Sequence, residues 1–410
     1  MTGLSARILG GLVLGLLAGA ALAGSQASSP LLAVAQPVGK LWLDALTMTV
    51  VPLVFSLLVT GIVSAADSAS AGRTAPRALL WFAVLLVGAC LVSAPLSTLA
   101  LDLWPVPAEA ASLRGTVGAT TVPSSSADWL ANVIPTNPLK SAADTAMVPL
   151  VIFALFFGFA VSRIESELRA AVQTFFRAIV QAMLVIVHWV LWVAPLGVFA
   201  LALGVGTRTG VGAVGALLHY VLLVIGACLV TTLLAYVVAA LLGRMSPLAF
   251  ARAALPAQAV AVSTQSSLAS LPAMIEAAGP LGIGKQDAGI VLPLAVSVFR
   301  AASAAANVTV AVYLAHLHGI ALGPGTLALG ALVAAAVSVA AVGLPAQVSF
   351  FAIIGPVCLA MGVPIDLLPL LLAIESIPDI FRTLGNVTAD LAVARLVGAR
   401  GAATEVPVNP

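Results

Sequence analysis

Three carboxylates and one guanidinium lie in an otherwise apolar segment near the end of this chain. With two polar neighbours they recur at helical spacing, which places all six on one face of a helix: Glu375, Asp379, Arg382, Thr383, Asn386 and Asp390. Arg382 presents a planar fork of donors that matches a carboxylate. Asp379 is a natural partner for an ammonium group, and Asn386 can donate to a second carboxylate. The stripe therefore suits an acidic amino acid, while Asp390 suits a hard cation with oxygen ligands.

The same residues could instead form an internal ladder of ion pairs that only holds helices together. Arg382 would then pair with Asp379 or Glu375 at helical spacing. A charged side chain at the centre of a bilayer costs about 2.5–3.5 kcal/mol even on the lenient insertion scale. Because ionisable residues inside a membrane are functional by default, we favour a binding site.

The composition indicates that the medium around this stripe is a membrane. Of 410 residues, 61% are hydrophobic and 8% are charged, whereas a soluble domain carries about 25% charged residues. So few charges could not cover the surface of a soluble protein of this size. The sequence therefore predicts a polytopic protein in the lipid bilayer and excludes soluble enzymes, nucleic-acid binders and disordered proteins. The net charge of +2 is too small to indicate an acidic partner.

The cysteines and histidines indicate neither a metal site nor a disulfide framework. Cys90, Cys228 and Cys358 stand singly in apolar runs and are expected to be small buried hydrophobes. The four histidines form no metal-binding motif. We therefore expect no cofactor beyond a coupling ion, either one sodium ion or a proton.

Apolar segments with polar breaks between them predict eight spans. They are expected at 8–24, 38–64, 76–104, 127–162, 170–206, 210–243, 287–317 and 365–398. The first could be a cleaved signal peptide, but the many later spans favour a transmembrane helix. Two further segments, 247–281 and 324–363, are each interrupted in the middle, at 266–272 and at 342–346.

Each interrupted segment could be two full spans joined by an ordinary loop, or a hairpin that enters the membrane and returns. The arms have roughly 15 to 20 residues, which is marginal for a span of about 20 residues. Breaks at membrane depth are tolerated only where they are buried in protein or line a cavity. Two such breaks in corresponding positions indicate inverted repeats around a binding site. We therefore expect an all-α membrane protein with eight transmembrane helices and two re-entrant helical hairpins.

The basic residues predict the orientation of the chain. With the N-terminus inside, eleven Lys and Arg residues fall on or near the cytoplasmic side and four on or near the outside. Both termini are therefore expected in the cytoplasm, with the protein in the cell's inner (plasma) membrane. Arg300 and Arg382 are left within the membrane.

Several motifs resemble those of one family of transporters. The segment 379–390 fits the pattern D-x-x-R-T-x-x-N-V-x-x-D, and shorter matches occur at 39–55, 132–138 and 194–200. Over essentially the whole chain, the sequence resembles the dicarboxylate/amino acid:cation symporters, the family of the glutamate transporters. The resemblance implies a secondary transporter, not an enzyme, that forms an obligate homotrimer and works by an elevator movement.

The resemblance also implies a division of the chain into two parts. The static scaffold would comprise 1–71 and 105–209, and the moving transport domain 72–104 and 210–402, with a tail at 403–410. The tips of the two hairpins would act as gates. The first tip contributes Ser266 and Ser267 beside Gln265, and the second contributes Gly343, Pro345 and Val348.

The resemblance assigns roles to the residues around the substrate, which would lie between the tips, Ser303 and the stripe. Arg382 would bind the side-chain carboxylate of an acidic amino acid. Asp379 and Thr383 would hold its amino group, and Asn386 its main-chain carboxylate. Family members for neutral amino acids lack the arginine, so Arg382 favours an acidic substrate.

The chain departs from the family where cations bind. The family's N-M-D-G-T signature becomes 299–303, Phe-Arg-Ala-Ala-Ser, and Leu85 and Leu86 replace a Thr-Ser pair. We infer that this inner sodium site does not exist here. A single sodium ion around Asp390 and Asn386 stays open, and Gln265 stands where many prokaryotic relatives have an arginine.

Arg300 replaces the methionine of the signature. Our hypothesis is that its fixed charge stands in for a bound sodium ion and neutralises Asp390. Alternatively, Arg300 points into a water-filled crevice and only helps to bind the substrate.

The sequence therefore predicts a transporter of aspartate, glutamate or related dicarboxylates, coupled to fewer sodium ions, to protons, or to none, as in an exchanger. Burial favours the neutral form of a carboxyl group, so Glu375 and Asp379 are candidates to carry a proton. A non-transporting substrate sensor or an anion channel on the same fold is the alternative. An intramembrane enzyme is disfavoured, because neither hairpin tip has a His or Cys beside its serines.

Overall fold

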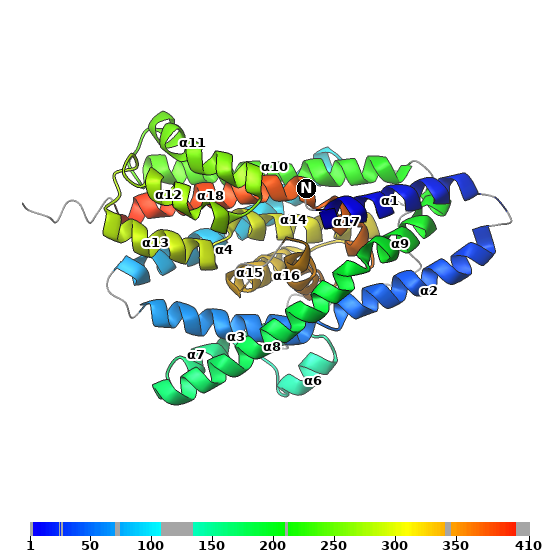
Figure 1. Ribbon diagram of the computed structural model, residues 1–410, viewed down its shortest axis with the longest axis horizontal. Helices are drawn as coiled ribbons and strands as arrows, with labels where there is room; N and C mark the ends of the chain where they lie inside the picture. Colours follow the sequence, from blue (N-terminus) through cyan, green and yellow to red (C-terminus); the bar gives the residue numbers. More distant parts are fainter. Residues whose placement is uncertain are drawn as a thin grey trace, which may run out of the picture.

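The protein is an elongated bundle of α-helices (Figure 1). The structure is a computed structural model that describes residues 3–23, 25, 28–69, 74–107, 134–209, 212–340 and 346–398. Its helices are α1 (Gly3–Leu22), α2 (Ser28–Thr47), α3 (Val50–Ala69), α4 (Thr74–Leu103), α6 (Pro138–Ala143), α7 (Met147–Val161), α8 (Ser166–Trp192), α9 (Ala194–Thr209), α10 (Gly212–Leu241), α11 (Pro247–Thr264), α12 (Ser267–Ala277), α13 (Lys285–Val298), α14 (Ala301–His318), α15 (Pro324–Ala340), α16 (Ala346–Ala360), α17 (Leu368–Ile374) and α18 (Ser376–Gly398).

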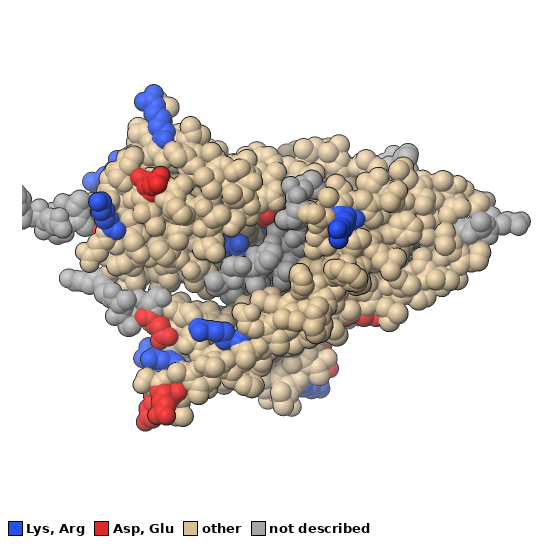
Figure 2. All heavy atoms as spheres, viewed as in Figure 1, with Lys and Arg blue, Asp and Glu red and all other residues tan. Residues whose placement is uncertain are grey.

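Length and composition agree with a membrane protein. Among the described residues, five helical stretches are long and apolar enough to cross a bilayer: Pro30–Asp67, Thr74–Leu103, Ser166–Trp192, Val214–Leu241 and Lys285–His318. On the face shown in Figure 2, most of the surface carries neither acidic nor basic side chains, and the charged ones gather mainly at the left end. A surface with so few charged side chains is what the hydrocarbon core of a bilayer requires.

Several predicted spans each consist of two helices in the structure. The segment 38–64 contributes to both α2 and α3, and 170–206 is divided at Val193, two residues before Pro195. The segment 287–317 is interrupted at Phe299 and Arg300, and 365–398 at Glu375. Of 127–162, the described part forms α6 and α7. Hydropathy alone does not predict these breaks, because the segments on both sides of each break are apolar.

The two interrupted segments each form a pair of short helices in contact with each other, α11 with α12 and α15 with α16. With 18, 11, 17 and 15 residues, these helices are shorter than the roughly 20 residues of a span. At the first tip, Gln265 adopts a left-handed conformation (φ 54°) and Ser266 caps α12. The second tip, 341–345, lies outside the described residues. The count of eight spans and two re-entrant hairpins stays a prediction.

Small residues allow close packing between α1 and α9. Gly11, Gly15 and Gly19 face the backbone of α9, where a Cβ on any of them would overlap main-chain atoms such as the carbonyl oxygen of Pro195. Such small-residue stripes let two membrane helices approach closely. Nearby, the indole of Trp42 donates a 2.9 Å hydrogen bond to the carbonyl of Val190, so α2 is fixed against the end of α8.

The centre of the bundle is α14, whose residues are almost all buried. It contacts α4, α10, α15, α16 and α18. A second set of contacts joins α1 and α2 to α9, and α3 to α7 and α8. The two sets meet where α3 contacts α15 and α16, and where α17 contacts α1 and α9. α14 therefore supplies the buried surface against which the polar stripe of α18 packs.

Candidate functional site

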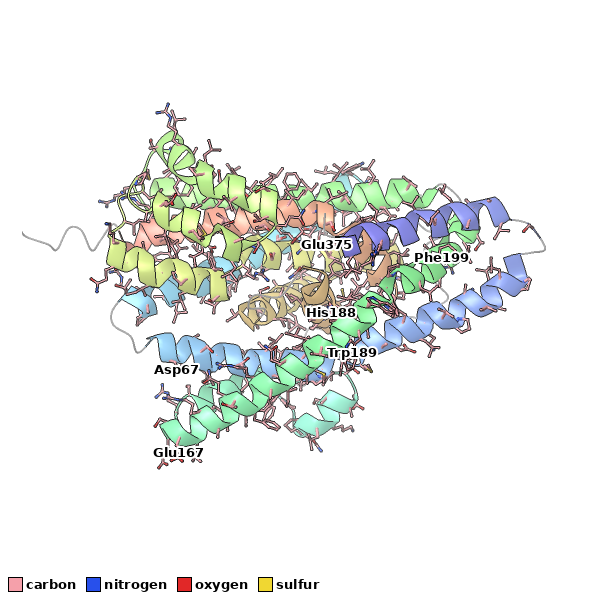
Figure 3. All side chains as sticks on the ribbon, viewed as in Figure 1. Asp67, Glu167, His188, Trp189, Phe199 and Glu375 are labelled. Carbon is pink, nitrogen blue, oxygen red and sulfur yellow. The ribbon has the colours of Figure 1, made fainter. Side chains whose placement is uncertain are left out.

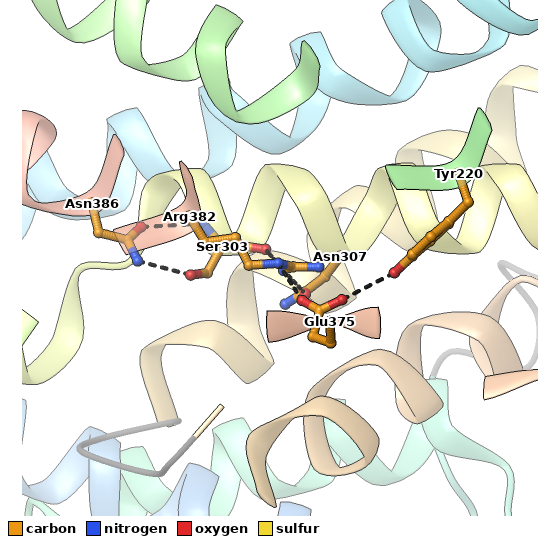
Figure 4. A network of polar contacts seen from close by, with 6 residues as sticks. All are labelled: Tyr220, Ser303, Asn307, Glu375, Arg382 and Asn386. Carbon is orange, nitrogen blue, oxygen red and sulfur yellow. Dashed lines mark hydrogen bonds and ion pairs between the residues drawn. The ribbon is translucent and has the colours of Figure 1, made fainter. Parts of the chain in front are cut away.

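The site lies where two broken helices meet, α13–α14 and α17–α18. Asn386 of α18 holds the start of α14 in place (Figure 4). Its Oδ1 accepts hydrogen bonds from the backbone N–H groups of Ala302 (3.0 Å) and Ser303 (3.1 Å). Its Nδ2 donates to Oγ of Ser303 (2.8 Å). Because the first N–H groups of a helix lack partners within it, this side chain stabilises the break at Phe299 and Arg300.

Arg382 is buried, with 4% of its surface exposed, and Glu375 is its counter-ion. Nε of Arg382 lies 2.7 Å from Oε1 of Glu375, and Tyr220 of α10 donates a 3.1 Å hydrogen bond to Oε2. Nη1 of Arg382 donates to Oδ1 of Asn307 (2.6 Å) and to the carbonyl of Ser303 (3.1 Å). Figure 4 shows this network converging on the guanidinium, and Figure 3 shows Glu375 inside the bundle.

The interpretation of the stripe as an ion-pair ladder, which we set aside from the sequence, is therefore correct in part. Arg382 pairs with Glu375 across the α17–α18 break, and the backbone N–H of Asp379 still donates to the carbonyl of Glu375 (3.0 Å). Glu375 thus stays in helical register with the stripe. The pair does not occupy the whole guanidinium, because Nη2 of Arg382 is buried and makes no hydrogen bond with the described residues. One donor is left for a ligand.

Asp379, Ser303 and Arg300 are partly exposed, whereas Thr383 and Asn386 are buried. Asp379 lies in the positive field of both Arg382 and Arg300. The structure therefore brings together Arg382, Asn386 and Ser303 through hydrogen bonds, with Asp379 beside them. A small anion at this place would meet the free donor of Arg382.

Asp390 lies one turn beyond Asn386 and is completely buried (0% exposed). Neither of its carboxylate oxygens accepts a hydrogen bond from the described residues. The charged group that acts on it is Arg300, which stands at the α13–α14 break with non-helical backbone angles (φ −128°, ψ 60°). Beside Arg300, the ring of Phe299 stacks on Phe82 of α4 at 4.8 Å.

The hairpin residues predicted as gates are placed only in part. Ser266 acts locally, since its Oγ accepts from the backbone N–H of Ala269 (3.2 Å) and its carbonyl from Oγ of Ser270 (2.9 Å). Ser267 is buried, and α12 contacts α18. Gly343 and Pro345 lie outside the described residues, as does the side chain of Val348. The roles of these gates stay predictions.

Sequence reasoning missed Tyr220 and Asn307, which complete the surroundings of Arg382. Asn307 follows Ser303 by four residues, in a helix whose other residues are almost all apolar. This spacing of four residues indicates that Asn307 lies on the same face of the helix as Ser303. Tyr220 follows His219 in the mostly apolar helix α10, and nothing near it in the sequence indicates a partner 155 residues away.

Comparisons with known proteins identify relatives that match most of the chain. The chain is 30% identical over 405 residues to the proton/glutamate-aspartate symporter of Escherichia coli (strain K12), covering 95% of this chain and 92% of that protein. It is 31% identical over 423 residues to the neutral amino acid transporter B(0) of Oryctolagus cuniculus (93% and 76% covered). It is 26% identical over 375 residues to the C4-dicarboxylate transport protein of Rhizobium johnstonii (89% and 82% covered).

All three relatives are transporters, and none is an enzyme. The model of one family, the sodium:dicarboxylate symporter family, matches residues 4–400. Because this match covers nearly the whole chain, this integral membrane protein belongs to the sodium:dicarboxylate symporter family.

Proposed function

We propose that this protein is a secondary active transporter of aspartate, glutamate or related dicarboxylates. The observation that carries the proposal is the free Nη2 donor of Arg382, on a guanidinium that Glu375 and Asn307 already hold in place. A pre-organised, desolvated guanidinium is a strong binder of carboxylates. The relatives named for glutamate, aspartate and C4-dicarboxylates support the same class of substrate.

The balance of charge supports co-transport. Glu375, Asp379 and Asp390 face Arg300 and Arg382, which leaves one net negative charge if all five are ionised. An acidic substrate would add at least one more negative charge in a buried site, where unpaired charge is costly. A proton or another cation therefore accompanies the substrate. We propose that protons, or exchange with internal substrate, replace most or all of the sodium coupling.

The contacts between helices favour an elevator movement. The scaffold would contain α1–α3 and α6–α9, and the moving part α4 and α10–α18, which agrees with the two sets of contacts described above. We propose a homotrimer in the plasma membrane with both termini in the cytoplasm. The contact of α3 with α15 and α16 would be the sliding surface.

Uptake of labelled L-aspartate, L-glutamate and succinate into proteoliposomes tests the proposal. The sodium gradient, the proton gradient and internal substrate are varied one at a time. We expect uptake above that of empty liposomes, driven by protons or by internal substrate. Arg382→Lys, which keeps the charge but loses the planar fork, should abolish uptake, while Arg177→Lys on the exposed face of α8 should not. No uptake by the wild type under any gradient would reject the function.

A further inference from the structure

The charge of the buried Asp390 carboxylate must be balanced by a group in its surroundings. A fully buried carboxylate without hydrogen bonds is unstable unless a positive charge lies near it. Both of its oxygens are buried and accept no hydrogen bond from the described residues. In many proteins a bound metal ion would meet this need through oxygen ligands.

The oxygen ligands that a metal ion would need are scarce around Asp390. Oδ1 of Asn386, one turn away, is already used by the N–H groups of Ala302 and Ser303. At the α13–α14 break, the residue before Arg300 is Phe299, and its ring and the ring of Phe82 on which it stacks carry only apolar atoms. Among the side chains named here, only Asp390 itself has oxygens that accept no hydrogen bond from the described residues.

Arg300 supplies the positive charge from within the chain. Its guanidinium is attracted by Asp379 and by Asp390 and is repelled by Arg382. The two carboxylates stand 11 residues apart on α18, or about 16 Å along the helix axis. Asn386 lies between these two carboxylates on α18 and binds the backbone of Ala302, two residues after Arg300. The break that Asn386 stabilises therefore places Arg300 at this level of α18.

We propose that Arg300 is a tethered counter-cation between Asp379 and Asp390, which takes the place of a bound metal ion and makes transport independent of sodium. The proposal rests on the proposed transport function. In this proposal, Arg300 positions Asp379 and Asp390 and does not bind the substrate. Direct binding of substrate by Arg300 is the competing account that the experiment must separate.

The first test compares three variants of the full chain in proteoliposomes, with labelled L-aspartate and either sodium or choline chloride outside. The wild type should take up aspartate equally in both salts. Arg300→Met should lose uptake in choline by about 100-fold, because it leaves a buried carboxylate unpaired, and sodium should restore part of it. Arg300→Lys should remain independent of sodium, and Arg177→Met on the exposed face of α8 serves as the control.

Two results would overturn the proposal while leaving the transport function intact. One is aspartate uptake by the wild type that requires sodium. The other is an Arg300→Met variant that only needs more aspartate, yet still ignores sodium, since Arg300 would then bind the substrate. Complete absence of uptake by the wild type would instead reject the transport function.

Thermal unfolding tests the charge pairing without any transport assay. Arg300→Met should lower the unfolding temperature, and the double variant Arg300→Met/Asp390→Asn should regain most of the loss, because it buries no unpaired charge. A double variant no more stable than Arg300→Met would contradict the pairing of Arg300 with Asp390.

Discussion

Nε of Arg382 lies 2.7 Å from Oε1 of Glu375, across the break between α17 and α18. The pair keeps the guanidinium in one orientation, with Nη2 left for a ligand. Glu375→Gln removes the counter-charge of a buried arginine, which costs about 3–5 kcal/mol when one partner of a buried pair is lost. We expect a lower unfolding temperature and a large loss of aspartate affinity, measured by thermal shift and by calorimetric titration.

The matched control for this variant is Asp67→Asn. Asp67 pairs with Arg169 at 3.5 Å, and both side chains are substantially exposed. An exposed pair contributes only about 0–1 kcal/mol, so this variant should behave as the wild type. Equal effects of the two variants would mean that Glu375 does not organise Arg382.

Tyr220 supports Arg382 through Glu375, to which its hydroxyl donates at 3.1 Å. Tyr220→Phe removes one hydrogen bond to a charged group, which contributes about 1.5–3 kcal/mol. We expect weaker aspartate binding in the single variant. In a Glu375→Gln background the same change should have little further effect, because the two residues act in one chain of contacts. Additive losses in this double-mutant cycle would show that Tyr220 acts independently of Glu375.

The helical stripe could be predicted from the sequence because it depends on local spacing alone. Arg382, Thr383, Asn386 and Asp390 do lie on one buried helix. The hydrogen-bond partners of these side chains could not be predicted in the same way. The amide oxygen of Asn386 accepts a hydrogen bond from the start of α14, more than 80 residues away in the sequence. Nothing local to Asn386 indicates that partner.

The breaks in the helices show the same limit. Phe299 continues the apolar run of its span, so periodicity favours an uninterrupted helix at 287–317. The break is stable because Asn386 of α18 accepts hydrogen bonds from the backbone N–H groups that the break leaves without helical partners. Likewise, the motifs at 39–55 and 194–200 could be recognised, but only the structure explains them, because the Trp42 ring packs against Gly197.

Gly197 is required by this contact between α2 and α9. A Cβ at Gly197 would overlap the ring of Trp42, whose indole is also fixed by its bond to Val190. We expect Gly197→Ala to lower stability by about 1–3 kcal/mol, the usual cost of overpacking, as measured by thermal unfolding in detergent. Gly88→Ala on α4 is the control, because a Cβ there meets nothing within 4 Å. A destabilised Gly88→Ala would mean that loss of glycine alone, and not the contact, causes the effect.

Gly385 lets α18 approach the start of α14. A Cβ at this position would lie 2.5 Å from Cβ of Ala302 and 2.9 Å from Oγ1 of Thr232. Gly385→Ala should push α18 away and lengthen the hydrogen bonds from Asn386 to Ala302 and Ser303. Because the binding site depends on these bonds, we expect aspartate affinity to fall more than stability does, unlike for Gly197→Ala. Gly226→Ala on α10, where a Cβ meets nothing within 4 Å, should leave affinity unchanged.

Gln258 links α11 to α18. Its Nε2 donates to Oγ1 of Thr388 (2.9 Å) and to the hydroxyl of Tyr236 (3.1 Å). Hydrogen bonds between membrane helices contribute about 0.6 kcal/mol on average, so Gln258→Leu should raise the rate of amide exchange in α11 by about threefold for each bond lost. Thr388→Val removes only one of the two bonds and should give a smaller increase. This contact fixes α11 against α18. If amide exchange in α11 becomes faster while the rate of aspartate uptake stays unchanged, movement of α11 does not limit transport.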